Sequence, residues 1–110
     1  MNIESNNTVT IIRGISFKSF PILKKYLVQY NTRTDYYKEQ YEEEMDEGLW
    51  DIWVSKGIRD LQPNISFFKS EKSNERIYSR IYVSFDWIIE KAKEDDALLA
   101  EVFILKMNGF

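Results

Sequence analysis

The sequence predicts a single α+β domain over residues 1–110, in which helices pack on one face of a four-stranded, largely antiparallel sheet. Two observations support this fold class. Several segments alternate between apolar and polar residues, as half-buried strands do, and others repeat apolar residues every three or four positions, as amphipathic helices do. In chain order the segments give β-α-α-β-β-α-β, a ferredoxin-like split β-α-β arrangement with one additional helix.

The first part of the chain is predicted to contain a tail, a strand and a helix. Residues 1–7 are expected to be a disordered N-terminal tail. Residues 8–17 are rich in β-branched side chains, which favour a strand. Ser19 is a candidate N-cap for the following helix, and Pro21 suits its first turn, where the N–H groups have no helical partner. The apolar stripe of this helix consists of Leu23, Tyr26, Leu27 and Tyr30.

Residues 34–57 combine helical periodicity with a high density of acids. Thr34 is a candidate N-cap, and Gly57 is a candidate left-handed stop. Gly48 is unfavourable inside a helix by about 1 kcal/mol, so a helix followed by a short strand is the alternative, and Trp50 is then buried. For a continuous helix, the core-facing stripe is Tyr37, Tyr41, Met45, Leu49, Ile52 and Lys56.

The second half of the chain is predicted to begin with a hairpin. Residues 64–70 and 75–85 alternate as two strands joined by a polar turn. A third helix follows, with Ser84 or Asp86 as its cap. Residues 98–107 are predicted to form a last strand, and their apolar residues on both parities indicate that both of its faces are covered. The predicted core comprises Leu23, Leu27, Tyr37, Tyr41, Met45, Ile77, Ile81, Val83, Ile88 and Phe103.

The composition excludes the most common catalytic chemistry. The chain has neither histidine nor cysteine, so it lacks the usual general base, the thiolate nucleophile and zinc-thiolate sites. No nucleotide-binding or hydrolase motif is present, and the acids do not fit a calcium-loop spacing. We therefore expect no enzymatic activity, no cofactor and no metal site.

The expected location is the cytoplasm of a bacterium or phage-infected cell. The first residues carry no signal-peptide pattern, and no apolar run is long enough to span a membrane. Ten lysines against five arginines, together with abundant isoleucine, suggest an AT-rich genome.

The acidic segment is the predicted partner site. Eight acids and one base lie between Asp35 and Asp51, giving a local charge of −7 in a chain whose net charge is −3. Such a negative pole attracts basic protein partners and repels the phosphate groups of nucleic acid. This pattern favours an inhibitor or immunity (anti-defence) type protein that masks a basic partner surface, although a merely solvated face is the competing interpretation. The predicted partner-binding residues are Tyr36, Glu39, Glu43, Asp46, Glu47 and Trp50.

A second candidate surface lies on the 75–85 strand. Tyr78, Arg80 and Tyr82 alternate on one face, which suits a small ligand or a second copy of the chain. The alternative functions are therefore a small-ligand sensor or enzyme, or a homo-oligomeric regulatory subunit such as a homodimer. We expect this face to be partly covered, by the long acidic helix or by a second copy.

Overall fold

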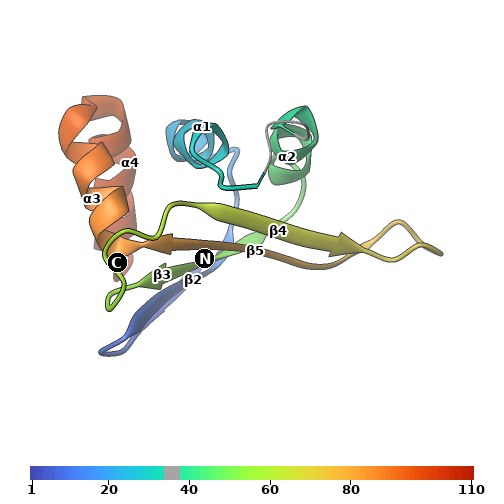
Figure 1. Ribbon diagram of the computed structural model, residues 1–110, viewed down its shortest axis with the longest axis horizontal. Coiled ribbons are helices and arrows are strands. Elements are labelled where there is room, and N and C mark those ends of the chain that lie inside the picture. Colours follow the sequence, from blue (N-terminus) through green and yellow to red (C-terminus); the bar gives the residue numbers. More distant parts are fainter. Residues whose placement is uncertain (34–37) are drawn as a thin grey trace.

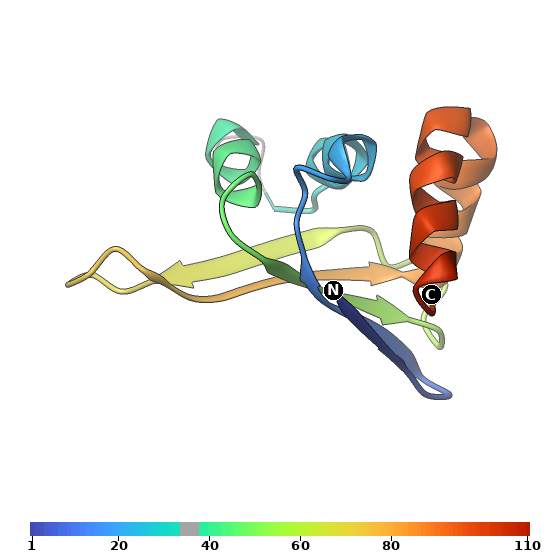
Figure 2. The ribbon, with the colours of Figure 1, turned by 180° about the vertical axis from the view of Figure 1, so that it is seen from behind.

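The computed structural model describes residues 1–33 and 38–110 and has two layers. Within these residues a mixed sheet of five strands forms one layer, and the helices form the other (Figure 1). The view from behind shows the same arrangement, with the second face of the sheet left bare (Figure 2). The elements are β1 (Asn2–Ser5), β2 (Val9–Ile15), α1 (Pro21–Gln29), α2 (Lys38–Met45), β3 (Trp50–Ser55), β4 (Asn64–Lys69), β5 (Arg76–Ser84), α3 (Phe85–Glu94) and α4 (Asp96–Met107).

The order of strands in the sheet is β1-β2-β3-β5-β4. Strands β3 and β5 pair in parallel, while the other neighbours pair antiparallel. The predicted α+β class is confirmed. The predicted four-stranded ferredoxin-like sheet is wrong, because the sheet has a fifth strand and one parallel pair, and because the chain ends in a helix.

Residues 2–5 form β1 and pair with β2, so the expectation of a disordered N-terminal tail is wrong. The turn between the two strands is organised by Asn6. Its Oδ1 accepts hydrogen bonds from the backbone N–H groups of Thr8, at 2.8 Å, and of Val9, at 3.0 Å. An Asn side chain that bonds its own backbone in this way fixes a tight turn and brings the two strands together.

Pro21 lies in the first turn of α1, as predicted, but the helix begins at Pro21 itself and its cap comes from a distant residue. Phe20 is at the N-cap position and makes no side-chain cap, so the prediction of Ser19 as the cap is wrong. The buried carboxylate of Glu101 instead accepts from the N–H of Ile22, at 3.0 Å, and of Leu23, at 2.7 Å. A carboxylate at this position satisfies two unpaired N–H groups and the positive end of the helix dipole.

Helix α2 ends at Met45, and Gly48 follows with φ of +68°. The chain then enters β3, so the alternative of a helix followed by a strand is confirmed and a continuous helix over residues 34–56 is wrong. A Cβ at Gly48 would lie 2.5 Å from Nη2 of Arg76, which is a second reason for glycine at this turn. The predicted cap Thr34 lies outside the described residues.

The hairpin of β4 and β5 is confirmed, and so is Ser84 as the cap of α3, because its Oγ accepts from the N–H of Trp87 at 3.2 Å. Ile81 and Val83 are fully buried under the helices, as predicted. Ile77 is exposed, so its assignment to the core is wrong. The far end of the hairpin projects beyond α2, where no described helix covers it (Figure 1).

Residues 98–107 lie in α4, so the predicted last strand is wrong. Asp95 caps this helix by accepting from the N–H of Ala97 at 2.9 Å. The buried positions recur with the helical period, whereas Phe103, predicted to be in the core, is exposed. The buried residues of α4 are Leu98, Glu101, Val102 and Leu105. In the described residues, no helix has both the length and the apolar character needed to cross a membrane.

Candidate functional site

The four carboxylates of the predicted partner site lie in two different environments. Glu39 and Glu43 are exposed and lie one turn apart on α2, and Glu47 is exposed in the turn that follows. Asp46 is half-buried and forms an ion pair with Lys24 of α1, with 2.8 Å between Oδ1 and Nζ. Three of the four predicted carboxylates therefore face solvent, and the fourth holds α2 against α1.

Trp50 is buried, with 1% of its surface exposed, so the prediction of an exposed aromatic anchor is wrong. It is the first residue of β3 and points toward the helices, where its ring packs edge-on against Phe17 and Phe67. Its indole N–H donates to the backbone oxygen of Glu44 at 3.2 Å. Tyr36, the other predicted anchor, lies outside the described residues.

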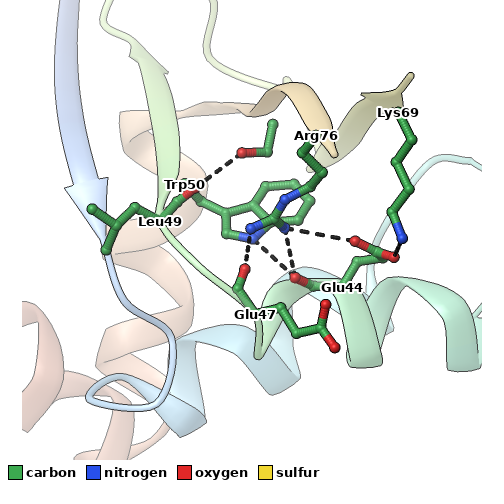
Figure 3. A network of polar contacts seen from close by, with 7 residues as sticks. Glu44, Glu47, Leu49, Trp50, Lys69 and Arg76 are labelled. Carbon is green, nitrogen blue, oxygen red and sulfur yellow. Dashed lines mark hydrogen bonds and ion pairs between the residues drawn. The ribbon is translucent and has the colours of Figure 1, made fainter. Parts of the chain in front are cut away.

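A polar network around Trp50 joins α2 to the hairpin (Figure 3). The buried carboxylate of Glu44 pairs with Nζ of Lys69 and lies 3.8 Å from Nη1 of Arg76. The Arg76 guanidinium donates to the backbone oxygens of Glu44 and Glu47 and stacks 4.9 Å from the Trp50 ring centroid. These contacts fix the end of α2, because they satisfy the Glu44 carbonyl, which has no partner within the helix, and the Glu47 carbonyl in the turn that follows.

The bare face of the sheet carries a cluster of aromatic and arginine side chains centred on Trp53 of β3. The guanidinium groups of Arg13 and Arg80 each lie 5.8 Å from the Trp53 ring, within cation–π range. The ring of Tyr82 lies 6.3 Å from Trp53, which is its direct neighbour in the β3–β5 register.

The cluster continues onto the hairpin. Arg80 also lies 5.7 Å from the Tyr78 ring, and Phe68 of β4 stacks on Tyr78 with 6.1 Å between centroids. We call these six residues the sheet-face cluster: Arg13, Trp53, Phe68, Tyr78, Arg80 and Tyr82. We expected this face to be partly covered by the long acidic helix or by a second copy of the chain. Cover by the acidic helix is wrong, because α2 lies on the opposite face of the sheet (Figure 1). Cover by a second copy is untested.

The charges of this face are balanced. Arg13 pairs with Glu4 of β1, at 3.2 Å, and with Asp51 of β3, at 3.8 Å. Arg80 is exposed, and no ion pair to it is found within residues 1–33 and 38–110. The face is therefore not a basic surface, but it offers one guanidinium that a binding partner can use.

A cavity of about 410 Å³ adjoins the cluster where β5 extends past the start of β3. The parallel pairing begins at Asp51 and Arg80, so the preceding residues of β5 have no β3 neighbour. Ser79 Oγ compensates by donating to the backbone oxygen of Leu49 at 3.0 Å. The cavity is lined by Leu49, Asp51, Arg76, Ile77, Tyr78, Ser79 and Arg80.

Sequence reasoning found half of the sheet-face cluster. It placed Tyr78, Arg80 and Tyr82 together, and it missed Arg13, Trp53 and Phe68. The parity of residues 50–55 carried a usable signal, since a buried Trp50 implies that Trp53 points to the other face. The neighbours of Trp53 could not be predicted from the sequence, because they depend on which strands pair.

Potential metal ligands do not cluster in the part of the chain that the structure describes, where no group of three or more acidic side chains could hold an ion. Comparisons with protein-family models, with curated proteins and with solved structures found no match to this chain.

Proposed function

We propose that this chain is a small protein-binding module and that its partner docks on the bare face of the sheet. The observation that supports the proposal is the sheet-face cluster, in which exposed Arg80 and Tyr82 contact Trp53, and exposed Tyr78 contacts Arg80. Tyrosine, tryptophan and arginine are the residues that most often dominate the binding energy of protein interfaces. Their preassembled stacking also lowers the entropy that would be lost on binding.

The charge distribution favours a protein over a nucleic acid. Single-stranded nucleic acids bind where stacking aromatics lie in a positively charged groove. On this face Glu4 and Asp51 offset Arg13 and Arg80, and the chain as a whole carries −3. The aromatic rings are present, but the electrostatic attraction that dominates nucleic-acid affinity is not.

The exposed acids of α2 give the proposal a preferred class of partner. Glu39, Glu43 and Glu47 are exposed, so they attract a basic protein at long range. With Trp50 buried and α2 on the other side of the sheet, we assign the short-range contacts to the sheet face and assign to this helix only a general attraction of basic proteins toward the molecule. An inhibitor or immunity-type protein that covers a basic partner surface remains our preferred form of the binding module.

A small anionic ligand is the second candidate, and the cavity beside the cluster favours it. The cavity has a volume of about 410 Å³, which is within the range of small-molecule sites. Arg80 lines it with a guanidinium that has no ion pair among the described residues, and a guanidinium binds carboxylate or phosphate in a bidentate manner. Arg76 also lines the cavity, but its guanidinium is already bound to Glu44 and Glu47. Native mass spectrometry of the purified chain distinguishes this candidate, because a retained small molecule would appear as a fixed mass increment.

The test of the proposed function is a matched pair of charge reversals, Arg80→Glu and Lys93→Glu. Both replace an exposed cation, but Lys93 lies on α3, on the other side of the sheet. The partner is first captured from a lysate of the source organism with the unmodified chain, then purified and titrated against each variant. We expect Arg80→Glu to weaken binding by about 30-fold or more, as for an interface hot spot, and Lys93→Glu to change it little.

A photo-reactive amino acid at position 82 provides a control that does not depend on affinity. It should cross-link to the captured partner, whereas the same group at position 93 should not. Equal binding by both variants, together with no cross-link from position 82, would exclude the sheet face as the interface.

A further inference from the structure

Helix α4 exposes a row of large apolar side chains. Leu99, Phe103, Ile104 and Met107 are all exposed, although the opposite side of the same helix is fully buried against the rest of the molecule. The helix lies at one end of the helical layer and faces the viewer in the view from behind, where no other described helix or strand covers it (Figure 2). Adjacent exposed apolar side chains of this size mark an interaction surface.

The outer side of α4 is asymmetric along its length. Its first half combines the small or acidic residues Asp96, Ala97 and Ala100 with one large residue, Leu99, and its second half has large or basic residues. The centre of the face follows the four-three-four spacing of a coiled-coil seam, through Asp96, Ala100, Phe103 and Met107. The second half of the face comprises Phe103, Ile104, Lys106 and Met107.

We propose that two copies of the chain form a twofold-symmetric dimer by packing α4 antiparallel to itself. With the axis crossing at the middle of the helix, between positions 101 and 102, Phe103 packs against the partner's Ala100. Asp96 then lies near the partner's Lys106, and the helix dipoles oppose each other. The same register sets Leu99 against the partner's Ile104 and Asp96 against the partner's Met107. Phe103 therefore meets a small residue, and the acid lies beside a base, at both ends of the seam.

The parallel arrangement lacks this complementarity. It would place Phe103 against the partner's Phe103 and Asp96 against the partner's Asp96, which pairs large residues with each other and like charges with each other. The asymmetry of the face thus favours a second copy, since the same helix supplies both halves of the match. A seam of about three turns is a small interface, so we expect a dissociation constant on the order of 1–100 µM.

The primary test is sedimentation velocity of the purified chain between about 1 and 200 µM, with a matched pair of variants. Phe103→Glu places a charge in the seam, and Ile58→Glu is the control, because the two side chains are 60% and 59% exposed. We expect the unmodified chain and Ile58→Glu to shift from monomer to dimer over this range. Phe103→Glu should stay monomeric, with an unchanged circular dichroism spectrum.

A strictly monomeric chain at 200 µM, or a dimer that persists in Phe103→Glu, would refute the proposal. The second result would place the contact elsewhere, for example on the sheet face. Because the purified chain is sufficient, this test does not depend on the proposed partner binding, and the two can fail separately.

Cross-linking tests the direction of the helices. The chain has no cysteine, so single-cysteine variants can be cross-linked without background. In the antiparallel dimer, the two copies of position 100 are offset by about 4.5 Å along the helix axes, and the two copies of position 107 by about 16 Å. A short bismaleimide should therefore join Ala100→Cys chains efficiently and Met107→Cys chains poorly. Equal yields, or a higher yield for Met107→Cys, would contradict the antiparallel arrangement.

Discussion

Helices α2 and α4 use their residues in opposite ways. Helix α2 is mostly charged, yet it supplies buried Tyr41 and Met45 to the core and is held in place by a polar network. Helix α4 is mostly apolar, yet it leaves Phe103 and Met107 in solvent. The composition of a helix therefore does not indicate whether its prominent residues are structural or available for binding.

The buried glutamates of the two helices show why. Glu44 of α2 is paired with the cations of Lys69 and Arg76, which reach it from the hairpin, while its Oε2 accepts no hydrogen bond from the described residues. Glu101 of α4 is satisfied by two backbone N–H groups at the start of α1. A buried carboxylate needs such partners, because leaving it unpaired is costly. Both charges hold elements together, so neither is available to a ligand.

The largest expected effect is that of replacing the tryptophan at the α2 junction. Trp50→Ala should destabilise the fold by about 3–5 kcal/mol, because it empties a fully packed site and removes the surface on which Arg76 stacks. Leu49→Ala is the neighbouring control. Leu49 is 61% exposed, so its replacement should cost less than about 0.5 kcal/mol. Urea denaturation measures both. A small effect for Trp50→Ala would restore it as a candidate contact residue.

The next largest effect on stability is expected on the buried side of α4, compared with its exposed side. Leu105→Ala should cost about 2–5 kcal/mol, because Leu105 is completely buried. Phe103→Ala, measured at a concentration where the chain is monomeric, should change stability by no more than about 0.5 kcal/mol. If the two losses were similar, the outer side of α4 would be part of the core and not a free surface.

Removal of the interior charge of α4 should have a smaller effect. Glu101→Ala leaves two N–H groups of α1 without their acceptor and should cost about 2 kcal/mol, the usual value for hydrogen bonds to a charged group. Glu43→Ala removes an exposed carboxylate from α2 and serves as the control. Thermal unfolding followed by circular dichroism should separate them. Equal midpoint temperatures for the two variants would mean that water satisfies the first N–H groups of α1 as well as the Glu101 carboxylate does.

The smallest effect concerns the start of α4. The hydroxyl of Tyr26 donates to Oδ2 of Asp95 at 2.8 Å. This hydrogen bond is the main cause of the lowered pKa of the Asp95 carboxyl, and the hydrogen bond from the N–H of Ala97 is the second cause. The same bond raises the pKa of Tyr26. Since the folded pKa of Asp95 is depressed, its stabilising contribution is present above the unfolded value of about 3.9 and is lost as the pH falls through the folded value.

Tyr26→Phe should therefore bring the pKa of Asp95 back toward its ordinary value and weaken the acid sensitivity of this contribution. A carboxyl-carbon NMR titration of the variant and the unmodified chain measures the shift. An unchanged Asp95 pKa would show that the backbone cap alone sets it, and α4 would then begin without help from α1.

Much of the fold was predictable from local patterns. Strands β2, β4 and β5 and helices α1 and α3 were predicted close to their observed bounds, because alternation, helical spacing and the Ser84 cap are properties of neighbouring residues. The predicted helix over residues 34–56 is observed from Lys38 to Met45 and ends before Gly48. For α4 the local signal failed, since apolar residues on every side conceal the helical period.

The sequence by itself thus determined the α+β class, the hairpin, the acidic pole and the absence of histidine and cysteine chemistry. Only the tertiary structure decided that Trp50 is buried and that Trp53 is the centre of an aromatic face. It also decided that Glu101 caps a helix almost 80 positions away in the chain. These outcomes depend on which strands pair and which side of each helix meets the sheet. Such choices are made by long-range packing, and the periodicity within one segment does not contain them.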